Sequence, residues 1–319
     1  MAAPHPPSPR QLRERARPMA AAPRKSAAAR PRRGYWRRHW RGELHLGTTV
    51  IVGAAIVWAV FNVLRWGQAR VDITDRPELS AGLWLAEVST LMLGAVWWGI
   101  GVARAAAAHR AQGGSSLVSM LAAAVGVAAC GWAAMVWFQS ARHHAPEVWA
   151  IASGKAAPAQ VTVDAARGEA VLVGDLEFGS KRALRRVLDA HPELRWVRLD
   201  SRGGRALEGL RIGQLIAERG LDTVVSGECS SACVTAFAGG SRRWIARSAR
   251  LGLHSAGGAV SAEEIARVNA EHDAFMRERG VAWRVLDKGQ AVAADSIWFP
   301  EPVTLLASRL ATDYAPVAR

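Results

Sequence analysis

The chain has 319 residues, a formal net charge of +14, and apolar side chains at half of its positions. Three cysteines are too few for a disulfide-rich secreted scaffold, and the apolar content excludes disorder over the whole chain. The charge is concentrated: residues 1–43 hold twelve Lys and Arg against two acidic residues, a net charge of +10. The overall charge is therefore no argument for a folded domain that binds nucleic acid, and no nucleic-acid partner is expected.

The first segment, residues 1–43, is rich in Pro, Ala and Arg and has neither a helical nor a strand period, which predicts disorder. Its arginines would suit phosphate groups of lipid or nucleic acid, and a mitochondrial transit peptide has a similar composition. Because long apolar runs follow, we favour a topology signal at the start of a multi-pass bacterial membrane protein.

Three long apolar runs come next. Residues 44–64 contain no charged side chain, residues 83–103 contain only Glu87, and residues 117–138 lie within a charge-free stretch. About 20 apolar residues in a helix span the hydrocarbon core, and backbone groups in lipid must be bonded internally. The sequence therefore predicts three transmembrane α-helices in a membrane region, residues 44–139, with the lipid bilayer as a partner. Glu87, near the end of its run, is expected at the interface rather than as an ion site.

The distribution of basic residues predicts the orientation. The tail is far more basic than the loop 65–82, in which three Arg face Asp72, Asp75 and Glu78. Lys and Arg mark the cytoplasmic side, so the tail should lie in the cytoplasm of a bacterium. Three crossings of the inner membrane then place the C-terminal part in the periplasm. Residues 140–159 are expected to be a tether, with His143 and His144 solvated rather than binding a metal.

The C-terminal segment, residues 160–319, alternates short apolar runs with amphipathic stretches. The last predicted helix opens with a capping box of Ser261 and Glu264. Alternating strands and helices predict an α/β domain, and about 155 residues suffice for its own core. Strands are expected over 161–163, 169–173, 196–199, 223–225, 244–246 and 250–253, and helices over 180–190, 206–219, 232–238 and 261–279.

Three stretches of this segment carry candidate chemistry. Ser201-Arg202-Gly203-Gly204 follows a strand, and a Gly-Gly turn there leaves N–H groups that can stabilise an oxyanion. Ser231 lies at a strand-to-helix turn, at the positive end of the helix dipole, although an N-cap role would place a serine there too. His254 ends a strand 23 residues later. A serine and a histidine form a nucleophile–base pair only if the fold brings them together.

In this order and spacing, the three stretches resemble the Clp protease proteolytic subunit family, within the ClpP/crotonase-like fold. That family has a Ser-Pro-Gly-Gly turn, a Gly-x-x-x-Ser nucleophile turn and a strand ending in the catalytic His. The resemblance covers about residues 160–313 and is nearest to membrane-anchored periplasmic ClpP-like proteins, which carry a Cys-x-Ser-Ala-Cys-like turn. It implies a ClpP/crotonase-like domain of repeated strand-helix units, preceded by the three transmembrane helices.

The resemblance implies roles for single residues. Ser231 would be the nucleophile and His254 the general base, and backbone N–H groups of Gly203 or Gly204 and of Ala232 would form the oxyanion hole.

The third catalytic member of the family is an Asp shortly before a Ser-Ala-Pro-Glu-like segment. Asp295, ahead of Phe299-Pro300-Glu301, matches it best, although the interval is one residue short. Asp287 is the main competitor.

Departures from the family pattern shape the expected activity. Arg202 replaces a proline, Cys233 stands where a small residue is usual, and segments that engage an ATP-driven unfoldase are not recognisable. The resemblance thus implies an ATP-independent serine peptidase, a hydrolase acting on peptides or unfolded segments, with no metal or organic cofactor. A homo-oligomer agrees with the rings that this fold commonly forms. The rivals are an inactive scaffold or sensor in the envelope and a crotonase-like acyl-CoA enzyme. A serine–lysine dyad is disfavoured because none of the few lysines has a suitable motif context.

Cys229 and Cys233 flank Ser231. An oxidising periplasm favours a disulfide between them, whereas helix-like spacing favours two buried free thiols, and both remain open. A cysteine nucleophile is the least favoured reading. Cys130 lies in the third apolar run and is expected to face lipid or to pack between helices.

Overall fold

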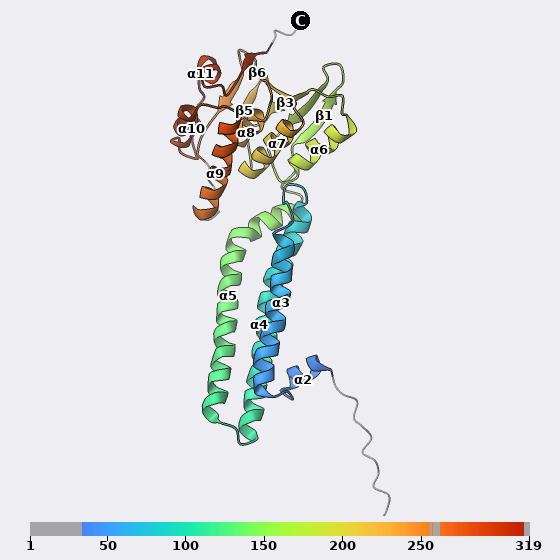
Figure 1. The fold of residues 1–319 in the computed structure, drawn as a ribbon, viewed down its shortest axis with the longest axis vertical. Helices are drawn as coiled ribbons and strands as arrows, with labels where there is room; N and C mark the ends of the chain where they lie inside the picture. Colours follow the sequence, from blue (N-terminus) through green and yellow to red (C-terminus); the bar gives the residue numbers. More distant parts are fainter. Residues whose placement is uncertain (1–33, 256, 258–261, 316–319) are drawn as a thin grey trace, which may run out of the picture.

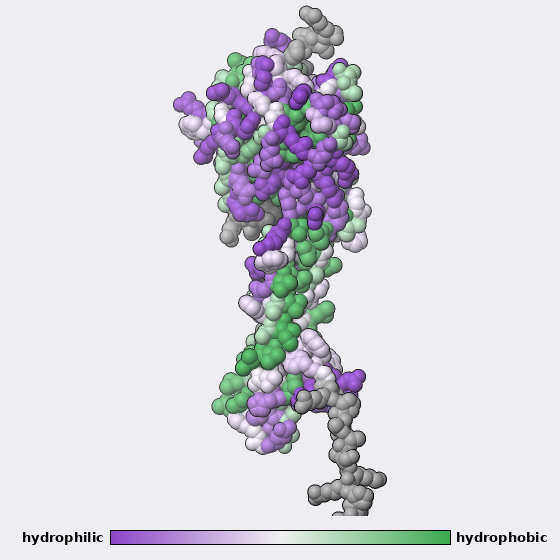
Figure 2. All heavy atoms as spheres, turned by 45° about the vertical axis from the view of Figure 1, so that its right-hand side comes forward, coloured by the Kyte–Doolittle hydropathy of each residue, from purple (hydrophilic) through white to green (hydrophobic). Residues whose placement is uncertain are grey.

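A stalk of long helices carries an α/β domain at one end in the computed structural model, which describes residues 34–255, 257 and 262–315 (Figure 1). Three helices in this part of the chain are long and apolar enough to cross a membrane. Figure 2 shows apolar surface along the stalk and mostly polar surface over the domain. The predicted succession of apolar helices and an α/β domain is thus present. The stalk helices are α3 (Leu46–Gln68), α4 (Pro77–Ala111) and α5 (Ser116–Ala152).

Small residues bring the stalk helices close together. A Cβ on Gly99 of α4 would lie 3.0 Å from the Sγ of Cys130 and 3.5 Å from the carbonyl oxygen of Gly126, both on α5. The Cys130 thiol donates to the Ala95 carbonyl at 3.4 Å. Glycine at such crossings allows the close backbone approach that stabilises helix pairs in a bilayer. Cys130 therefore packs between α4 and α5, one of its two expected environments.

Two boundaries of the membrane region differ from the sequence prediction. Residues 35–41, predicted to be disordered, form α2 (Tyr35–Arg41), because the His39 ring packs on the Trp97 ring of α4 with 4.0 Å between centroids. Residues 140–159, predicted as a tether, continue helix α5 as far as Ala152 with Pro146 inside it. The helix bends near this end (Figure 1), as expected where proline removes a backbone hydrogen bond. Residues 1–33 of the tail lie outside the described residues.

The domain is built on a six-stranded sheet within the described residues. Its strand order is β1-β2-β3-β4-β6-β8, with β1 and β2 antiparallel and the other neighbours parallel. The mixed α/β class predicted from the sequence is therefore confirmed. The strands are β1 (Gln160–Asp164), β2 (Glu169–Val173), β3 (Trp196–Asp200), β4 (Asp222–Val225), β6 (Arg243–Ile245) and β8 (Asp313–Tyr314).

Helices of the domain bury the apolar faces that the sequence pattern predicts. Leu184, Ile212 and Ile216 on the helices pack in one core with Leu172 and Leu199 of the sheet, all fully buried. The predicted capping box of the fourth helix lies outside the described side chains. The helices are α6 (Ser180–Ala190), α7 (Ala206–Glu218), α8 (Ala232–Ala238), α9 (Ala262–Glu278), α10 (Trp283–Gln290) and α11 (Pro302–Ala307).

Arg243 ties the C-terminal part to this core. Its side chain is buried and donates to the carbonyl oxygens of Gly240, Arg279, Arg309 and Leu310 at 2.6–3.2 Å. Burial lowers the pKa of the Arg243 guanidinium to about 10. Four carbonyl dipoles therefore hold the cation in a largely dry environment.

A second, two-stranded parallel sheet leads into the candidate site. It pairs β5 (Glu228–Ser230) with β7 (Arg250–Gly252), and a further parallel bridge joins Ser201 to Cys229. The ends of β3, β5 and β7 are thereby brought side by side. These are the three places at which the sequence carries candidate chemistry.

Candidate active site

Ser231 occupies a strained turn between β5 and α8. Its backbone has φ 56° and ψ −127°, a conformation that residues other than glycine rarely adopt. The turn is held by a hydrogen bond from the Ser231 N–H to the Gly252 carbonyl at 2.8 Å. Strained strand-to-helix turns present the serine nucleophile in other hydrolase folds. The Ser231 side chain makes no capping bond to the described residues, so the competing N-cap role is not observed.

The neighbouring serine is not equivalent. Ser230 is fully buried, and its hydroxyl donates to a carboxylate oxygen of Glu228 at 2.9 Å. Ser231 instead lines a cavity at the start of α8. Of this pair, Ser231 is therefore the serine whose hydroxyl a ligand in the cavity can meet.

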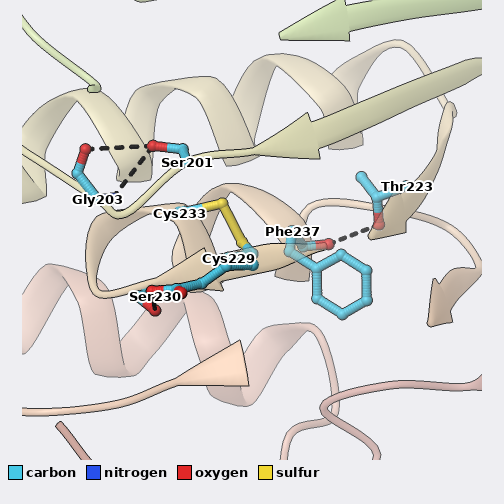
Figure 3. Close-up of a disulfide and its surroundings, with 8 residues drawn as sticks. Ser201, Gly203, Thr223, Cys229, Ser230, Cys233 and Phe237 are labelled. Atoms are coloured by element: carbon cyan, nitrogen blue, oxygen red, sulfur yellow. Dashed lines mark hydrogen bonds between the residues drawn. A yellow bond between two sulfur atoms is a disulfide. The ribbon is translucent and has the colours of Figure 1, made fainter. Parts of the chain in front are cut away.

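A disulfide closes the turn around Ser231. The sulfur atoms of Cys229 and Cys233 are bonded at 2.05 Å, and the two Cα atoms lie 5.2 Å apart (Figure 3). Both residues are fully buried. The four-residue spacing suggests helix geometry, but Cys229 is in a strand and the turn at Ser231 brings Cys233 back toward it. The alternative of two free thiols is therefore not what the structure contains.

Gly203 packs directly on this turn. Its φ is 110°, and a Cβ placed there would lie 2.7 Å from the Cβ of Ser231 and 2.8 Å from the Ser230 carbonyl oxygen. Both distances are shorter than real Cβ atoms tolerate, so a side chain would displace the nucleophile turn. The predicted Gly-Gly turn and the predicted serine turn are thus in contact.

The N–H groups around the turn differ in availability. The Gly203 N–H donates to the Ser201 hydroxyl at 3.1 Å (Figure 3). The N–H groups of Gly204 and Ala232 find no acceptor among the described residues. Of the three residues expected to supply an oxyanion hole, Gly204 and Ala232 therefore keep an unpaired N–H within the described structure, and Ala232 also lines the cavity, while the donor of Gly203 is occupied.

His254 reaches the same cavity from the end of β7. Its neighbour Leu253 exchanges backbone hydrogen bonds with Trp298 at 2.9 and 3.0 Å, and the Ser255 N–H donates to the Val292 carbonyl at 2.9 Å. These bonds fix the chain on both sides of the histidine. The Nδ1 atom of His254 is buried and has no hydrogen-bond partner within the described residues. The structure thus places Ser231 and His254 on one cavity, with one ring nitrogen of the histidine unsatisfied.

Neither candidate acid meets that nitrogen. Asp295 lies on the loop 292–298, whose ends are bonded on either side of His254, yet it is exposed and accepts from the Ser296 hydroxyl at 3.3 Å. Asp287 is exposed on α10. The expected triad of Ser231, His254 and Asp295 is therefore incomplete in this structure, because the Asp295 carboxylate faces solvent.

The cavity beside Ser231 has a volume of about 80 Å³ and a largely apolar lining. Helix α9 contributes Val268, His272 and Met276, which repeat every four residues on one face. His272 is a polar lining residue that the sequence analysis missed. Its Nδ1 lies 3.1 Å from an oxygen of Asp273, which also accepts from Gln290 at 2.8 Å. The four-residue spacing between His272 and Met276 in a predicted helix was the sequence signal that could have indicated it. No group of three metal-ligating side chains gathers in the described part of the chain.

Comparison with known proteins gives a partial match in fold. The structure of ClpP1 from Listeria monocytogenes is similar with a TM-score of 0.42 and 16% sequence identity, covering 48% of this chain and 94% of that chain. A mutant of the same ClpP1 gives 0.42 and 15%, covering 48% and 93%. No family model and no curated protein sequence matches the chain. The similarity concerns the fold of about half of the chain.

Proposed function

We propose that this chain is a membrane-anchored, ClpP-like serine peptidase that cleaves peptides or unfolded segments on the periplasmic side without ATP. The observation that carries the proposal is the strained, uncapped Ser231 turn on the same cavity as His254. Backbone strain of this kind persists only where the surrounding structure maintains it, and it concentrates at functional sites.

The proposed reaction follows the serine hydrolase scheme. The Ser231 oxygen attacks the peptide carbonyl while His254 accepts its proton and then passes it to the leaving amine. The free N–H groups of Gly204 and Ala232 stabilise the negative oxygen of the tetrahedral intermediate. Water, activated by His254, then releases the acyl group from Ser231.

Asp295 is proposed to orient His254 after a rotation of its loop. The unsatisfied Nδ1 of His254 supplies the position for a carboxylate, and both ends of the 292–298 loop are already bonded beside it. Catalytic hydrogen bonds are often looser without substrate. Asp295→Asn is expected to slow acylation at least tenfold, whereas Asp287→Asn should leave it within twofold. Equal effects of the two substitutions would contradict this assignment.

Labelling of the full-length protein in membranes by a fluorophosphonate probe tests the mechanism. Wild type should label, Ser231→Ala should not, and Ser230→Ala serves as the matched control that should still label. A wild type that resists the probe, or a Ser231→Ala variant that labels equally, would contradict the proposal.

Two features support the proposed location. The basic tail favours a cytoplasmic N-terminus, and the Cys229–Cys233 disulfide favours an oxidising compartment for the domain. Alkaline phosphatase fused after the last residue should be active, because that enzyme needs export. If the alkaline phosphatase fusion is inactive and a reporter that works only in the cytoplasm is active at the same position, this topology is wrong.

A second candidate, a non-catalytic scaffold or sensor, is favoured by one observation. The His254 Nδ1 has no partner in the described structure, as in a site that no longer needs an oriented base. The labelling experiment separates the two functions, since a scaffold has no reason to keep a reactive Ser231. A homo-oligomer is proposed for either function and is measured by the mass of the detergent-solubilised protein.

A further inference from the structure

Ion pairs dock the domain on the end of the stalk. Lys181 of α6 is nearly buried, and its ammonium lies 2.9 Å from a carboxylate oxygen of Asp72 and 3.0 Å from one of Asp75. Both acids belong to the loop between α3 and α4. We call the contacts between the two parts the ionic junction. In the described part of the chain it consists of Lys181, Arg182, Arg185 and Arg205 on the domain and Asp72, Asp75, Glu78 and Glu147 on the membrane region.

The ion pairs of the ionic junction have close and partly bidentate geometry. Arg182 forms a bidentate pair with Glu78 at 2.8 and 3.0 Å, and Arg185 meets Asp75 at 3.0 Å. Exposed single ion pairs contribute little, but bidentate geometry and a network around a buried ammonium contribute more. The domain is therefore held in one orientation on the stalk.

Arg205 connects the ionic junction to the candidate site. Its guanidinium meets Glu147 of α5 at 2.5 Å and Glu177 at 2.8 Å. Gly204, with its free N–H, precedes it, and Ala206, which lines the cavity, follows it. The ionic junction thus reaches within one residue of the cavity wall.

The height of the site above the bilayer follows from α5. Glu147 comes nine residues after the apolar run that ends at position 138. At 1.5 Å per residue this is about 14 Å along the helix, of which the headgroup layer takes roughly 5–7 Å. The bend of α5 lowers the position further, and α9, which lines the cavity, extends from the domain toward the stalk (Figure 1). One wall of the cavity therefore belongs to a helix that extends toward the membrane region (Figure 1).

We infer that the substrate is a polypeptide anchored in the same bilayer and cut in the extended segment just outside its anchor. This inference rests on the peptidase function proposed above. The height of about 14 Å reckoned for Glu147 is covered by about four extended residues at 3.3–3.6 Å each, so a short segment outside an anchor reaches the level of the ionic junction. A segment anchored in the bilayer emerges on the side of the domain toward which α9 extends, and its anchor keeps it at that side (Figure 1).

The test uses full-length protein in liposomes with two substrates that share one transmembrane helix and one cleavable sequence. A linker of about eight residues separates them in the near substrate, and a Gly/Ser linker of about forty residues does so in the far one. The near substrate should be cut at least tenfold faster. The charge reversal Arg182→Glu with Arg185→Glu should reduce this ratio below threefold, because it opposes Glu78 and Asp75.

Matched controls make the result specific. Arg186→Glu is the control for the single variant Arg182→Glu, since each reverses one charge on α6. Arg186 is exposed and pairs with no acid among the described residues, so Arg186→Glu should keep the tenfold ratio, whereas Arg182→Glu should lower it. Adding Glu78→Arg to Arg182→Glu should restore the pair and the ratio. Fluorophosphonate labelling accompanies each variant. Labelled protein that cuts near and far substrates equally overturns the inference, whereas a wild type that does not label overturns the proposed function and this inference with it.

Discussion

Replacing Gly203 by alanine tests whether the Gly-Gly turn supports the nucleophile. The new Cβ would lie 2.7 Å from the Cβ of Ser231, about 1 Å inside an ordinary carbon contact, and 2.8 Å from the Ser230 carbonyl oxygen. At φ 110° the alanine also adopts a conformation that is essentially restricted to glycine. Gly220→Ala is the matched control, with φ 63° and no atom within 4 Å of the added Cβ.

The magnitudes separate the two variants. For Gly203→Ala, backbone strain costs about 1–3 kcal/mol and overpacking about 1–3 kcal/mol, hence about 4 kcal/mol in unfolding free energy. For Gly220→Ala the left-handed conformation alone costs about 1 kcal/mol. At about 2–4 °C per kcal/mol, the expected losses in Tm are roughly 8–16 °C and 2–4 °C.

Activity should respond more strongly than stability, because a displacement of about 1 Å at the reacting centre can cost about a hundredfold in rate. Thermal unfolding in detergent and the rate of fluorophosphonate labelling measure the two effects. The reasoning is refuted if Gly203→Ala unfolds like Gly220→Ala and labels at the wild-type rate, since the contact with Ser231 would then have no consequence.

Three further predictions concern the disulfide, a buried cation and the ionic junction. Replacing Cys229 and Cys233 together by serine should lower the unfolding free energy by about 2 kcal/mol in urea titrations and slow labelling; unchanged labelling would show that the turn needs no covalent closure. Arg243→Met leaves the carbonyl oxygens of Arg279, Arg309 and Leu310 without this donor, while the Gly240 carbonyl keeps its bond from Arg279; it should cost about 3 kcal/mol, so a loss below 1 kcal/mol would contradict its role. Burial alone would raise the pKa of Asp72, but hydrogen bonds from Thr74 and Lys181 lower it to about 2. The ion pair of Asp72 with Lys181 therefore stabilises the ionic junction above pH 3.8, and this stabilisation is lost as the pH falls toward 2. Protease cleavage at the ionic junction, measured against pH, follows the loss. Lys181→Met should move the midpoint of this pH profile upward, and an unchanged midpoint would exclude the pair as the cause.

The sequence predicted the regular elements where apolar periodicity is strong. Helices α6 and α8 begin and end where predicted, and the parallel strands differ by a residue or so. Strands β5 and β8 were not predicted because Glu228–Ser230 and Asp313–Tyr314 contain no aliphatic residue, whereas the equally short β6 and β7 contain Ile245 and Leu251. Helix α5 extends beyond its apolar run because helix formation depends on backbone bonding, not only on hydropathy.

The sequence named candidate residues for the site but could not predict their geometry. Motif order singled out Ser231 and His254, which do line one cavity. The exposed side chain of Asp295 and the occupied N–H of Gly203 depend on single rotations and hydrogen bonds that no residue pattern encodes. The contact of Lys181 with Asp72 spans 109 positions, so only the folded chain reveals it.

The disulfide at the site has a mechanical consequence. The ring closed by Cys229 and Cys233 contains five residues, and Ser231 is the middle one. A residue at φ 56° relaxes when the chain on either side can swing away, and a covalent ring denies that swing. The shape of the serine turn is therefore clamped locally. The serine turn should keep its conformation at temperatures at which the surrounding helices become mobile. Warming should therefore weaken substrate contacts before it displaces the Ser231 hydroxyl.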